Sequence, residues 1–129
     1  MHKQILIVDD ESGVVVPLQF LMEQQGYNVM TAQRGEDALD LIYQYKPDLV
    51  LLDIMLPGID GYEVCEIARL NPNYRDVKIV FLTARRSEVE IAKGLTLGGD
   101  AYITKPFSNA ELVALVKKLL ENTIDEDSE

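Results

Sequence analysis

Five side chains of this sequence are of types that could act together in one reaction. They are three carboxylates, a hydroxyl and an ammonium group, and each comes at the end of a short apolar segment: Asp9 and Asp10 after residues 3–8, Asp53 after 49–52, Thr83 after 78–82 and Lys105 after 101–103. Taken singly, an acidic residue after a strand is usually a helix cap, and a lone lysine is usually solvated. Their joint occurrence at the ends of successive apolar segments is much harder to attribute to chance.

The chemistry of such a cluster is limited by its charge. Carboxylates within a few ångströms of one another repel, so they either hold a proton or bind a cation. A ligand set of oxygens, without histidine or cysteine, favours Mg²⁺ or Mn²⁺ over zinc. A carboxylate can also attack phosphorus to give an aspartyl phosphate, and a divalent metal and a lysine would neutralise the developing charge. Thr83 could then donate to a phosphoryl oxygen, and the small Ala84 leaves room for a phosphoryl donor.

The elements that would position these side chains alternate between strand and helix. Strands are predicted over residues 3–8, 27–32, 49–52, 78–82 and 101–103, and helices from about residue 14 to 26, over 36–45, 60–70 and 87–97, and from 108 onward. Residues 49–52 are apolar without alternation, which is typical of a strand buried on both faces of a parallel sheet. The alternation favours such a sheet, with right-handed crossovers and helices on both faces. Parallel strands point their carboxyl ends to one edge, so the five side chains should converge there.

Local signals indicate how three of the helices begin. Asp60 with Glu63, and Ser108 with Glu111, have the spacing of capping boxes. Pro17 follows three valines and lies just beyond the first turn of its helix, so we expect a distorted start there. The last helix is expected to turn three residues toward the core: Leu112, Val116 and Leu119.

Length, charge and composition exclude several classes of protein. A chain of 129 residues, 47% hydrophobic and 26% charged, is typical of one soluble globular domain. Its formal net charge of −10 argues against direct binding of nucleic acid. No apolar run approaches the ~20 residues that span a bilayer, no signal peptide is apparent, and Cys65 is the single cysteine, more consistent with packing than with chemistry. We therefore expect a cytoplasmic protein without membrane contact.

The acidic residues 122–129 are expected to form a disordered tail or the start of a linker.

Four motifs carry a resemblance to a known family. They are IVDDE (residues 7–11), LVLLDIMLPGIDG (49–61), FLTA (81–84) and AYITKPF (101–107). Together they resemble the receiver domain of the two-component response regulators, over about residues 3–121. The resemblance implies a flavodoxin-like (CheY-like) α/β fold, a doubly wound (βα)5 sandwich with a five-stranded parallel sheet of order 2-1-3-4-5, forming one domain over residues 1–121. It also implies that Asp53 accepts a phosphoryl group from the phosphohistidine of a sensor histidine kinase or a histidine phosphotransfer protein.

The resemblance also implies a role for each residue of the site. Mg²⁺ (or Mn²⁺) would be bound by the side chains of Asp10 and Asp53, by Asp9 largely through a metal-bound water, and by the backbone carbonyl of Met55. The phosphoryl group would contact Thr83 and Lys105. Two further residues complete the set: Pro106, expected after a cis peptide bond, and Tyr102, expected to act with Thr83 as a switch.

Phosphorylation would act through charge. It would add a dianion that Thr83 and Lys105 can bind, and so bias their loops toward one of two arrangements. The face formed by the fourth helix, fifth strand and fifth helix would then change its affinity for an effector protein or an output domain. The domain would catalyse only its own phosphorylation and slow hydrolysis, and it is not expected to be a metabolic enzyme.

The sequence departs from one pattern within the family. Receivers attached to winged-helix DNA-binding domains often pair an acidic residue with an arginine across a dimer, and here those positions hold Ala101 and Leu115. This puts that mode of dimerisation in doubt without excluding a phosphorylation-dependent homodimer. Leu115 would either offer an apolar contact or widen the buried stripe of its helix. Two interpretations stay open: a stand-alone receiver that acts by protein contact, or a receiver cut from a longer DNA-binding regulator.

Three rival functions fit the sequence less well. A phosphatase of the haloacid dehalogenase type would need a second aspartate two residues after the nucleophile, where this chain has Met55. A flavodoxin-like FMN binder would need a phosphate loop rich in serine and threonine after the first strand, where this chain has acidic residues 9–11. A receiver that cannot be phosphorylated is opposed by the complete set of Asp9, Asp10, Asp53, Thr83 and Lys105.

Overall fold

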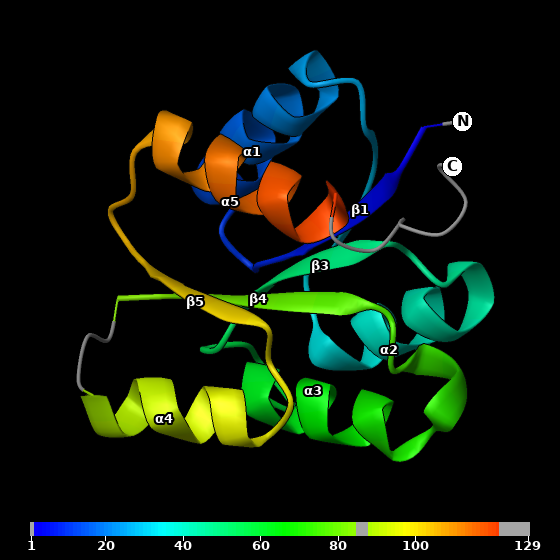
Figure 1. Cartoon of the computed structure of the whole chain (residues 1–129). Coiled ribbons are helices and arrows are strands. Elements are labelled where there is room, and N and C mark those ends of the chain that lie inside the picture. The colour runs from blue at the N-terminus through cyan, green and yellow to red at the C-terminus, as the bar shows by residue number, and fades with distance from the viewer. Residues whose placement is uncertain (1, 85–87, 122–129) are drawn as a thin grey trace.

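The chain is described by a computed structural model, which places residues 2–84 and 88–121. These residues form five β-strands and five α-helices in alternation, with one short 3₁₀ turn, η1 (Pro72–Tyr74) (Figure 1). The strands are β1 (Gln4–Val8), β2 (Asn28–Ala32), β3 (Leu49–Asp53), β4 (Lys78–Thr83) and β5 (Ala101–Thr104). The helices are α1 (Ser12–Gln24), α2 (Gly35–Tyr45), α3 (Gly61–Leu70), α4 (Glu88–Thr96) and α5 (Asn109–Glu121). The predicted tail, residues 122–129, and the predicted start of the fourth helix at residue 87 lie outside the described residues.

All five strands run parallel in the order β2-β1-β3-β4-β5, which confirms the predicted flavodoxin-like topology. The register brings the carboxyl ends of the strands level. Asp53 of β3 is paired with Leu82 of β4, and Thr83 with Thr104 of β5. The residues that follow β1, β3, β4 and β5 therefore meet along one edge of the sheet.

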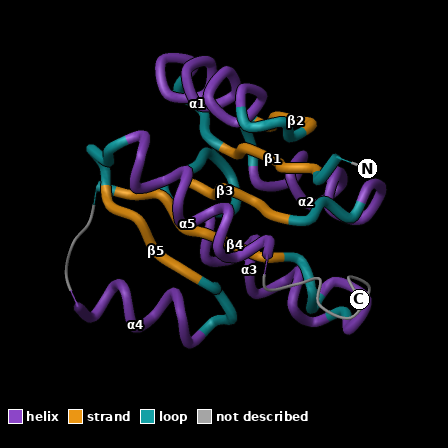
Figure 2. The backbone as a smooth tube through the Cα atoms, turned by 45° about the horizontal axis from the view of Figure 1, so that its top comes forward, coloured by secondary structure: helices purple, strands orange, loops and turns teal. Residues whose placement is uncertain are grey.

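Helices cover both faces of the sheet. α1 and α5 lie on one face, and α2, α3 and α4 on the other (Figures 1 and 2). Successive residues of β3 enter two different cores: Leu49 and Leu51 pack with α1 and α5, whereas Val50 and Leu52 pack with α2 and α3. All four are fully buried, which is why this segment shows no polar alternation. No helix within the described ranges is long and apolar enough to cross a lipid bilayer.

Two helices begin at the predicted caps. The carboxylate of Asp60 accepts a hydrogen bond from the amide of Glu63 at 2.9 Å, and the carboxylate of Glu63 accepts one from the amide of Asp60 at 2.9 Å. This reciprocal pair is the predicted capping box at the start of α3. At α5 the hydroxyl of Ser108 accepts from the amide of Glu111 at 3.0 Å, which provides one half of the second box.

The start of α1 is less disturbed than predicted. The helix runs unbroken from Ser12 through Pro17, although a proline at this depth removes one backbone hydrogen bond. The irregularity is confined to the first turn, where the amides of Val14 and Val15 both donate to the carbonyl of Glu11, at 2.9 and 3.1 Å.

The buried face of α5 is wider than predicted. Leu112 and Val116 are fully buried as expected, but Leu120 is buried as well, while Leu119 is only partly buried. Leu115 also packs, partly buried, against the core formed with α1, so it widens the buried stripe of α5.

Cys65 has the packing role that its neighbours predict. It lies on α3 and is fully buried in the core between the sheet and helices α2 and α3. Burial raises the pKa of its thiol to about 11, which keeps it protonated and unreactive.

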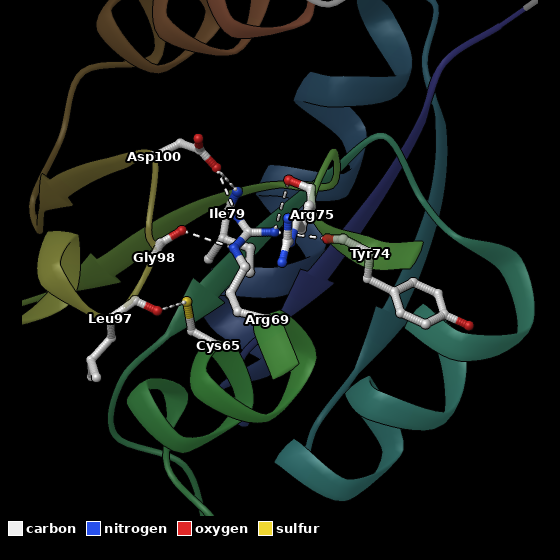
Figure 3. Close-up of polar contacts among 8 residues, drawn as sticks. All are labelled: Cys65, Arg69, Tyr74, Arg75, Ile79, Leu97, Gly98 and Asp100. Atoms are coloured by element: carbon white, nitrogen blue, oxygen red, sulfur yellow. Dashed lines mark hydrogen bonds and ion pairs between the residues drawn. The ribbon is translucent and has the colours of Figure 1, made fainter. Parts of the chain in front are cut away.

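One arginine closes the edge of the sheet opposite the predicted site (Figure 3). Arg69, near the end of α3, donates from Nε to the carbonyl of Gly98 at 3.0 Å and from Nη1 to that of Tyr74 at 2.8 Å. Its Nη2 lies 3.0 Å from the carboxylate of Asp100, which also accepts from the amide of Ile79 at 2.8 Å. A single side chain thereby joins α3 to the segment after α4 and to the starts of β4 and β5.

Replacing this arginine should weaken the whole domain. Arg69→Met keeps much of the aliphatic stem but leaves the Asp100 carboxylate and the carbonyls of Tyr74 and Gly98 without their donor. We expect urea denaturation to show a loss of about 2–3 kcal/mol in the free energy of unfolding. Arg75→Met, at an exposed arginine nearby, is the matched control and should change it by less than about 0.5 kcal/mol. Equal losses in both variants would contradict the role of Arg69.

Candidate functional site

Three carboxylates meet at the carboxyl edge of the sheet, where the sequence predicts them. Ligand atoms of Asp9, Asp10 and Asp53 all lie within 4.8 Å of one another. Asp9 and Asp53 are 0% and 5% exposed, whereas Asp10 is exposed. They come together because β1 and β3 are neighbours in the sheet and end at the same level.

Lys105 reaches across this edge from the end of β5. Its Nζ atom lies 2.9 Å from Oδ2 of Asp9, 3.7 Å from Oδ2 of Asp53 and 3.8 Å from Oε1 of Glu11. The backbone amide of Lys105 donates to the carbonyl of Thr83 at 2.7 Å, which joins the loop after β5 to the end of β4. The backbone of the lysine is therefore held by β4, and its ammonium group faces the carboxylates at the ends of β1 and β3.

The peptide bond between Lys105 and Pro106 is cis, the isomer that the resemblance implies. Thr83 is 1% exposed at the end of β4, next to Ala84. The predicted set of Asp9, Asp10, Asp53, Thr83 and Lys105 thus lies at one edge of the sheet.

The two buried carboxylates are engaged to different degrees. Asp9 uses both oxygens: Oδ1 accepts from the amide of Glu11 at 3.0 Å, and Oδ2 accepts from Lys105 at 2.9 Å. In Asp53, Oδ1 accepts a longer bond from the amide of Met55, at 3.4 Å, while Oδ2 faces Lys105 at 3.7 Å. Asp53 therefore keeps more acceptor capacity for a ligand than Asp9 does.

The electrostatics of the site favour a further cation. Burial, and then repulsion from Asp9 and more weakly from Asp10, raises the pKa of Asp53 from 3.8 to about 6, although Lys105 and the Met55 amide oppose this. For Lys105, burial acts to lower the pKa, but the hydrogen bond to Asp9 and the charge on Asp53 hold it above its ordinary value. Among the residues that the structure places, these three carboxylates therefore share one ammonium group, that of Lys105. A divalent cation with oxygen ligands would complete the charge balance, so the donor set fits Mg²⁺ or Mn²⁺.

A cavity of about 300 Å³ opens at these side chains. Its lining consists of Asp10, Glu11, Asp53, Met55, Ala84 and Lys105. Met55 is 60% exposed at its rim, and Ala84 presents only a methyl group, so the cavity is accessible from solvent. It offers space for a metal ion and a phosphoryl group in contact with Asp53.

Tyr102 lies apart from the carboxylates, in an aromatic row against the sheet. The ring centroid of Phe81 is 5.3 Å from that of Tyr62 and 6.2 Å from that of Tyr102. The hydroxyl of Tyr102 is buried and makes no hydrogen bond to the described residues. The side chain thus points inward, and its hydroxyl would gain from any shift that brings a partner within reach.

Two contributors to the site were not singled out from the sequence. Glu11 lines the cavity and lies 3.8 Å from Lys105, and its place in the acidic run of residues 9–11 is the signal that could have found it. Gly61 begins α3 directly against β3: a Cβ there would contact the carbonyl oxygen of Asp53 and lie 2.8 Å from Cα of Ile54. Its place at the end of the motif over residues 49–61 fits this need for a glycine.

Fold and site together define a class of protein, a CheY-like α/β domain with an acidic pocket at the carboxyl edge of its sheet. Residues 5–117 match the family model of the response regulator receiver domain. The chain belongs to this family of two-component signalling proteins.

Solved structures are similar over nearly the whole chain. A putative response regulator from Chloroflexus aurantiacus is 38% identical, with a TM-score of 0.89, over 94% of this chain and 99% of that one. The BeF3-activated N-terminal receiver domain of RstA from Klebsiella pneumoniae is 34% identical, with a TM-score of 0.84, over 92% and 98% of the two chains. A CheY-like receiver domain protein from Methanospirillum hungatei is 32% identical, with a TM-score of 0.86, over 95% and 96%.

Mg²⁺ should stabilise the protein through the acidic pocket. An ion that binds only the folded state stabilises it, so millimolar Mg²⁺ should raise the thermal midpoint of the wild type by about 2–5 °C. Asp10→Asn removes the exposed carboxylate, leaves the buried pair of Asp9 and Lys105 intact, and should abolish most of this increase. Asp37→Asn, at an exposed aspartate of α2, is the matched control and should retain it. An equal response in both variants would place the ion elsewhere.

Asp53→Asn should stabilise the metal-free protein, and the gain should depend on pH. The pKa of Asp53 is about 6 in the folded protein against an ordinary 3.8, so folding disfavours its ionised form. Above about pH 6 the wild type bears this cost in full, and the substitution should add about 2 kcal/mol to the free energy of unfolding. Below that the folded carboxyl takes up a proton, and the gain should fall toward zero near the ordinary pKa. Thermal unfolding in EDTA at about pH 8 and about pH 4.5 measures the difference. A gain that is independent of pH would show that the ionised Asp53 carboxylate is not its source.

Proposed function

We propose that this chain is a phosphoacceptor, in which Asp53 takes a phosphoryl group from the phosphohistidine of a sensor histidine kinase or a histidine phosphotransfer protein. The observation that carries the proposal is the setting of Asp53, nearly buried beside an accessible cavity with its Oδ2 3.7 Å from the Lys105 ammonium. A carboxylate placed in this way is a nucleophile with a counter-charge ready for an incoming anion. Two of the similar structures are described as BeF3-activated receiver domains, and BeF3 resembles a phosphoryl group in shape and charge.

The transfer exchanges one bond to phosphorus for another. An oxygen of the ionised Asp53 attacks the phosphorus, and the O–P bond forms as the N–P bond to histidine breaks. The electron pair of the N–P bond stays on the ring nitrogen, and the other ring nitrogen carries a proton, so histidine leaves as neutral imidazole. Charge spreads over the three remaining phosphoryl oxygens during this step. The ammonium of Lys105 binds one of them, and the hydroxyl of Thr83 donates to another.

The reaction is proposed to depend on Mg²⁺, with Mn²⁺ as a substitute. Asp10, Asp53 and the backbone carbonyl of Met55 would hold the ion, which supplies neutralising charge at the phosphoryl oxygens. Asp9 would act largely through a metal-bound water. The indirect role of Asp9 agrees with the hydrogen bonds in the site, because both of its oxygens already accept from Glu11 and Lys105.

The proposed output is a change at the face formed by α4, β5 and α5. A phosphoryl group that draws in Thr83 would also move Lys105, whose amide is bonded to the Thr83 carbonyl at 2.7 Å. Tyr102, on β5 beside Phe81, would respond as the second part of the switch. The partner would be an effector protein or an output domain in the cytoplasm. Asp100 is engaged within the chain by Arg69 at 3.0 Å, which makes it less available for pairing across a homodimer.

Intact mass spectrometry tests the proposal directly. Incubation with acetyl phosphate and Mg²⁺ should add about 80 Da, the mass of one phosphoryl group, to the wild type. The adduct should be absent in Asp53→Asn and in the presence of EDTA. Asp60→Asn, at the capping aspartate of α3 outside the pocket, is the matched control and should gain the same mass. If neither acetyl phosphate nor a phosphorylated histidine kinase gave an adduct at Asp53, the phosphoacceptor function would be wrong.

A further inference from the structure

We propose that Tyr62 is a positioning residue that holds α4 in place and links it to the backbone of Asp53, as a route to the α4 face separate from Thr83 and Tyr102. The proposal rests on the phosphoacceptor function of Asp53. It assigns a signalling role to a side chain of α3, which otherwise serves as a packing helix. The two helices lie next to each other beneath the sheet (Figure 1).

The hydroxyl of Tyr62 is bonded to α4. It donates to Oε1 of Glu90 at 2.8 Å and lies 3.2 Å from the backbone carbonyl of the same residue. The ammonium of Lys93, one turn further along α4, lies 4.7 Å from the centroid of the Tyr62 ring. Tyr62 is 5% exposed, so its hydrogen bond to Glu90 is partly shielded from water and is stronger than it would be at a surface.

Among the side chains of α4 that the structure describes, two apolar ones lie toward solvent, and Ile91 is half-buried. Leu95 is 44% exposed, and Ala92 is exposed as well. The helix approaches the sheet at Gly94, where a Cβ would lie 3.0 Å from two atoms of the Phe81 ring and 3.3 Å from Cε1 of Tyr62. The backbone of α4 thus rests on the edge-to-face pair of Tyr62 and Phe81, and the contacts to Glu90 and Lys93 fix its position there.

The other end of the link is the phosphoacceptor strand. Gly61, the residue before Tyr62, donates its amide to the carbonyl of Ile54 at 2.9 Å. A Cβ at Gly61 would contact the carbonyl oxygen of Asp53, so no side chain separates the start of α3 from the end of β3. A displacement of the Asp53 backbone on phosphorylation would therefore reach Tyr62 through one peptide unit, and α4 through the bond to Glu90.

The ring of Tyr102 also packs against Phe81, with centroids 6.2 Å apart, and makes the link sensitive to the state of the switch. Burial first, and then the neighbouring Glu90 and Tyr102, raises the pKa of Tyr62 well above its ordinary value. The buried hydroxyl of Tyr102 has no hydrogen-bond partner within the described residues. The oxygen of Tyr62 can still accept a hydrogen bond, so a small shift of the row would allow Tyr102 to donate to it.

Hydrogen exchange of the α4 amides, residues 88–96, tests the proposal with and without beryllium fluoride and Mg²⁺. Tyr62→Phe keeps the ring and removes the hydroxyl. Without activation, we expect the α4 amides of this variant to exchange about tenfold faster than those of the wild type. With activation, the change in α4 exchange should be less than half of that in the wild type.

Three further measurements separate a positioning role from loss of stability. Tyr74→Phe is the matched control, because it removes a hydroxyl that donates to the carbonyl of Tyr43 at 3.2 Å, far from α4, and it should leave α4 exchange unchanged. Glu90→Gln keeps an acceptor for Tyr62 and should behave as the wild type. Combining Tyr62→Phe with Glu90→Ala should add little to either change alone, because both break one bond.

The outcomes distinguish this proposal from the phosphoacceptor function. Normal α4 exchange in Tyr62→Phe, or faster exchange with an undiminished response to activation, would overturn the role of Tyr62. Intact mass after acetyl phosphate treatment reports on Asp53 in the same samples, and both wild type and Tyr62→Phe should gain the phosphoryl group. If the wild type neither gained it nor responded to beryllium fluoride, the phosphoacceptor function itself would have failed.

Discussion

Repulsion among three carboxylates at one edge of a sheet is the constraint on which the rest of this structure depends. Asp9 and Asp53 are buried, their ligand atoms lie within 4.8 Å of those of Asp10, and Lys105 is the cation that the described residues bring to them. Burial first, and then repulsion from Asp9, raises the pKa of Asp53 to about 6. Such a cluster persists only on a rigid support, because the charges would otherwise separate into water. The same burial and repulsion make the site receptive to a divalent ion, so the cost in stability and the capacity to bind are linked.

The parallel sheet supplies that support. Leu49, Leu51, Val50 and Leu52 are fully buried, the first two in the core with α1 and α5 and the others in the core with α2 and α3. A strand packed on both faces and bonded on both edges cannot shift alone, so the ends of β1 and β3 stay level and their aspartates stay close. The loops beyond those ends are free of this restraint. The charged side chains at the strand ends are therefore held in place, whereas the loops and α4 can move.

Most of the site could be predicted from the sequence because it follows from topology. Once the strands are known to be parallel, residues such as Asp53 and Thr83 must share one edge, and their spacing along the chain does not matter. The individual contacts could not be predicted. Nothing local shows that Asp9 would use both oxygens within the protein, that Arg69 would bind Asp100, or that Tyr62 would bind Glu90. These bonds join elements whose relative positions are set by packing of the whole domain. For Pro17 the local rule overestimated the disturbance, because α1 runs unbroken through it and only the first turn is irregular.

The two ends of α4 are attached in different ways, and this suggests where a conformational change begins. Beyond its carboxyl end, the Gly98 carbonyl accepts from Arg69 at 3.0 Å, and the same guanidinium pairs with Asp100. That attachment involves α3, the start of β4 and the residue before β5, and it lies at the sheet edge away from the carboxylates. Nearer its amino end, within the part of α4 that the structure describes, the Tyr62 hydroxyl donates to the Glu90 side chain, and the Lys93 ammonium lies over the Tyr62 ring. A helix joined beyond one end to a guanidinium with several partners would pivot about that end. Movement driven by charge at Asp53 would therefore be largest near the start of α4 and smallest at Gly98.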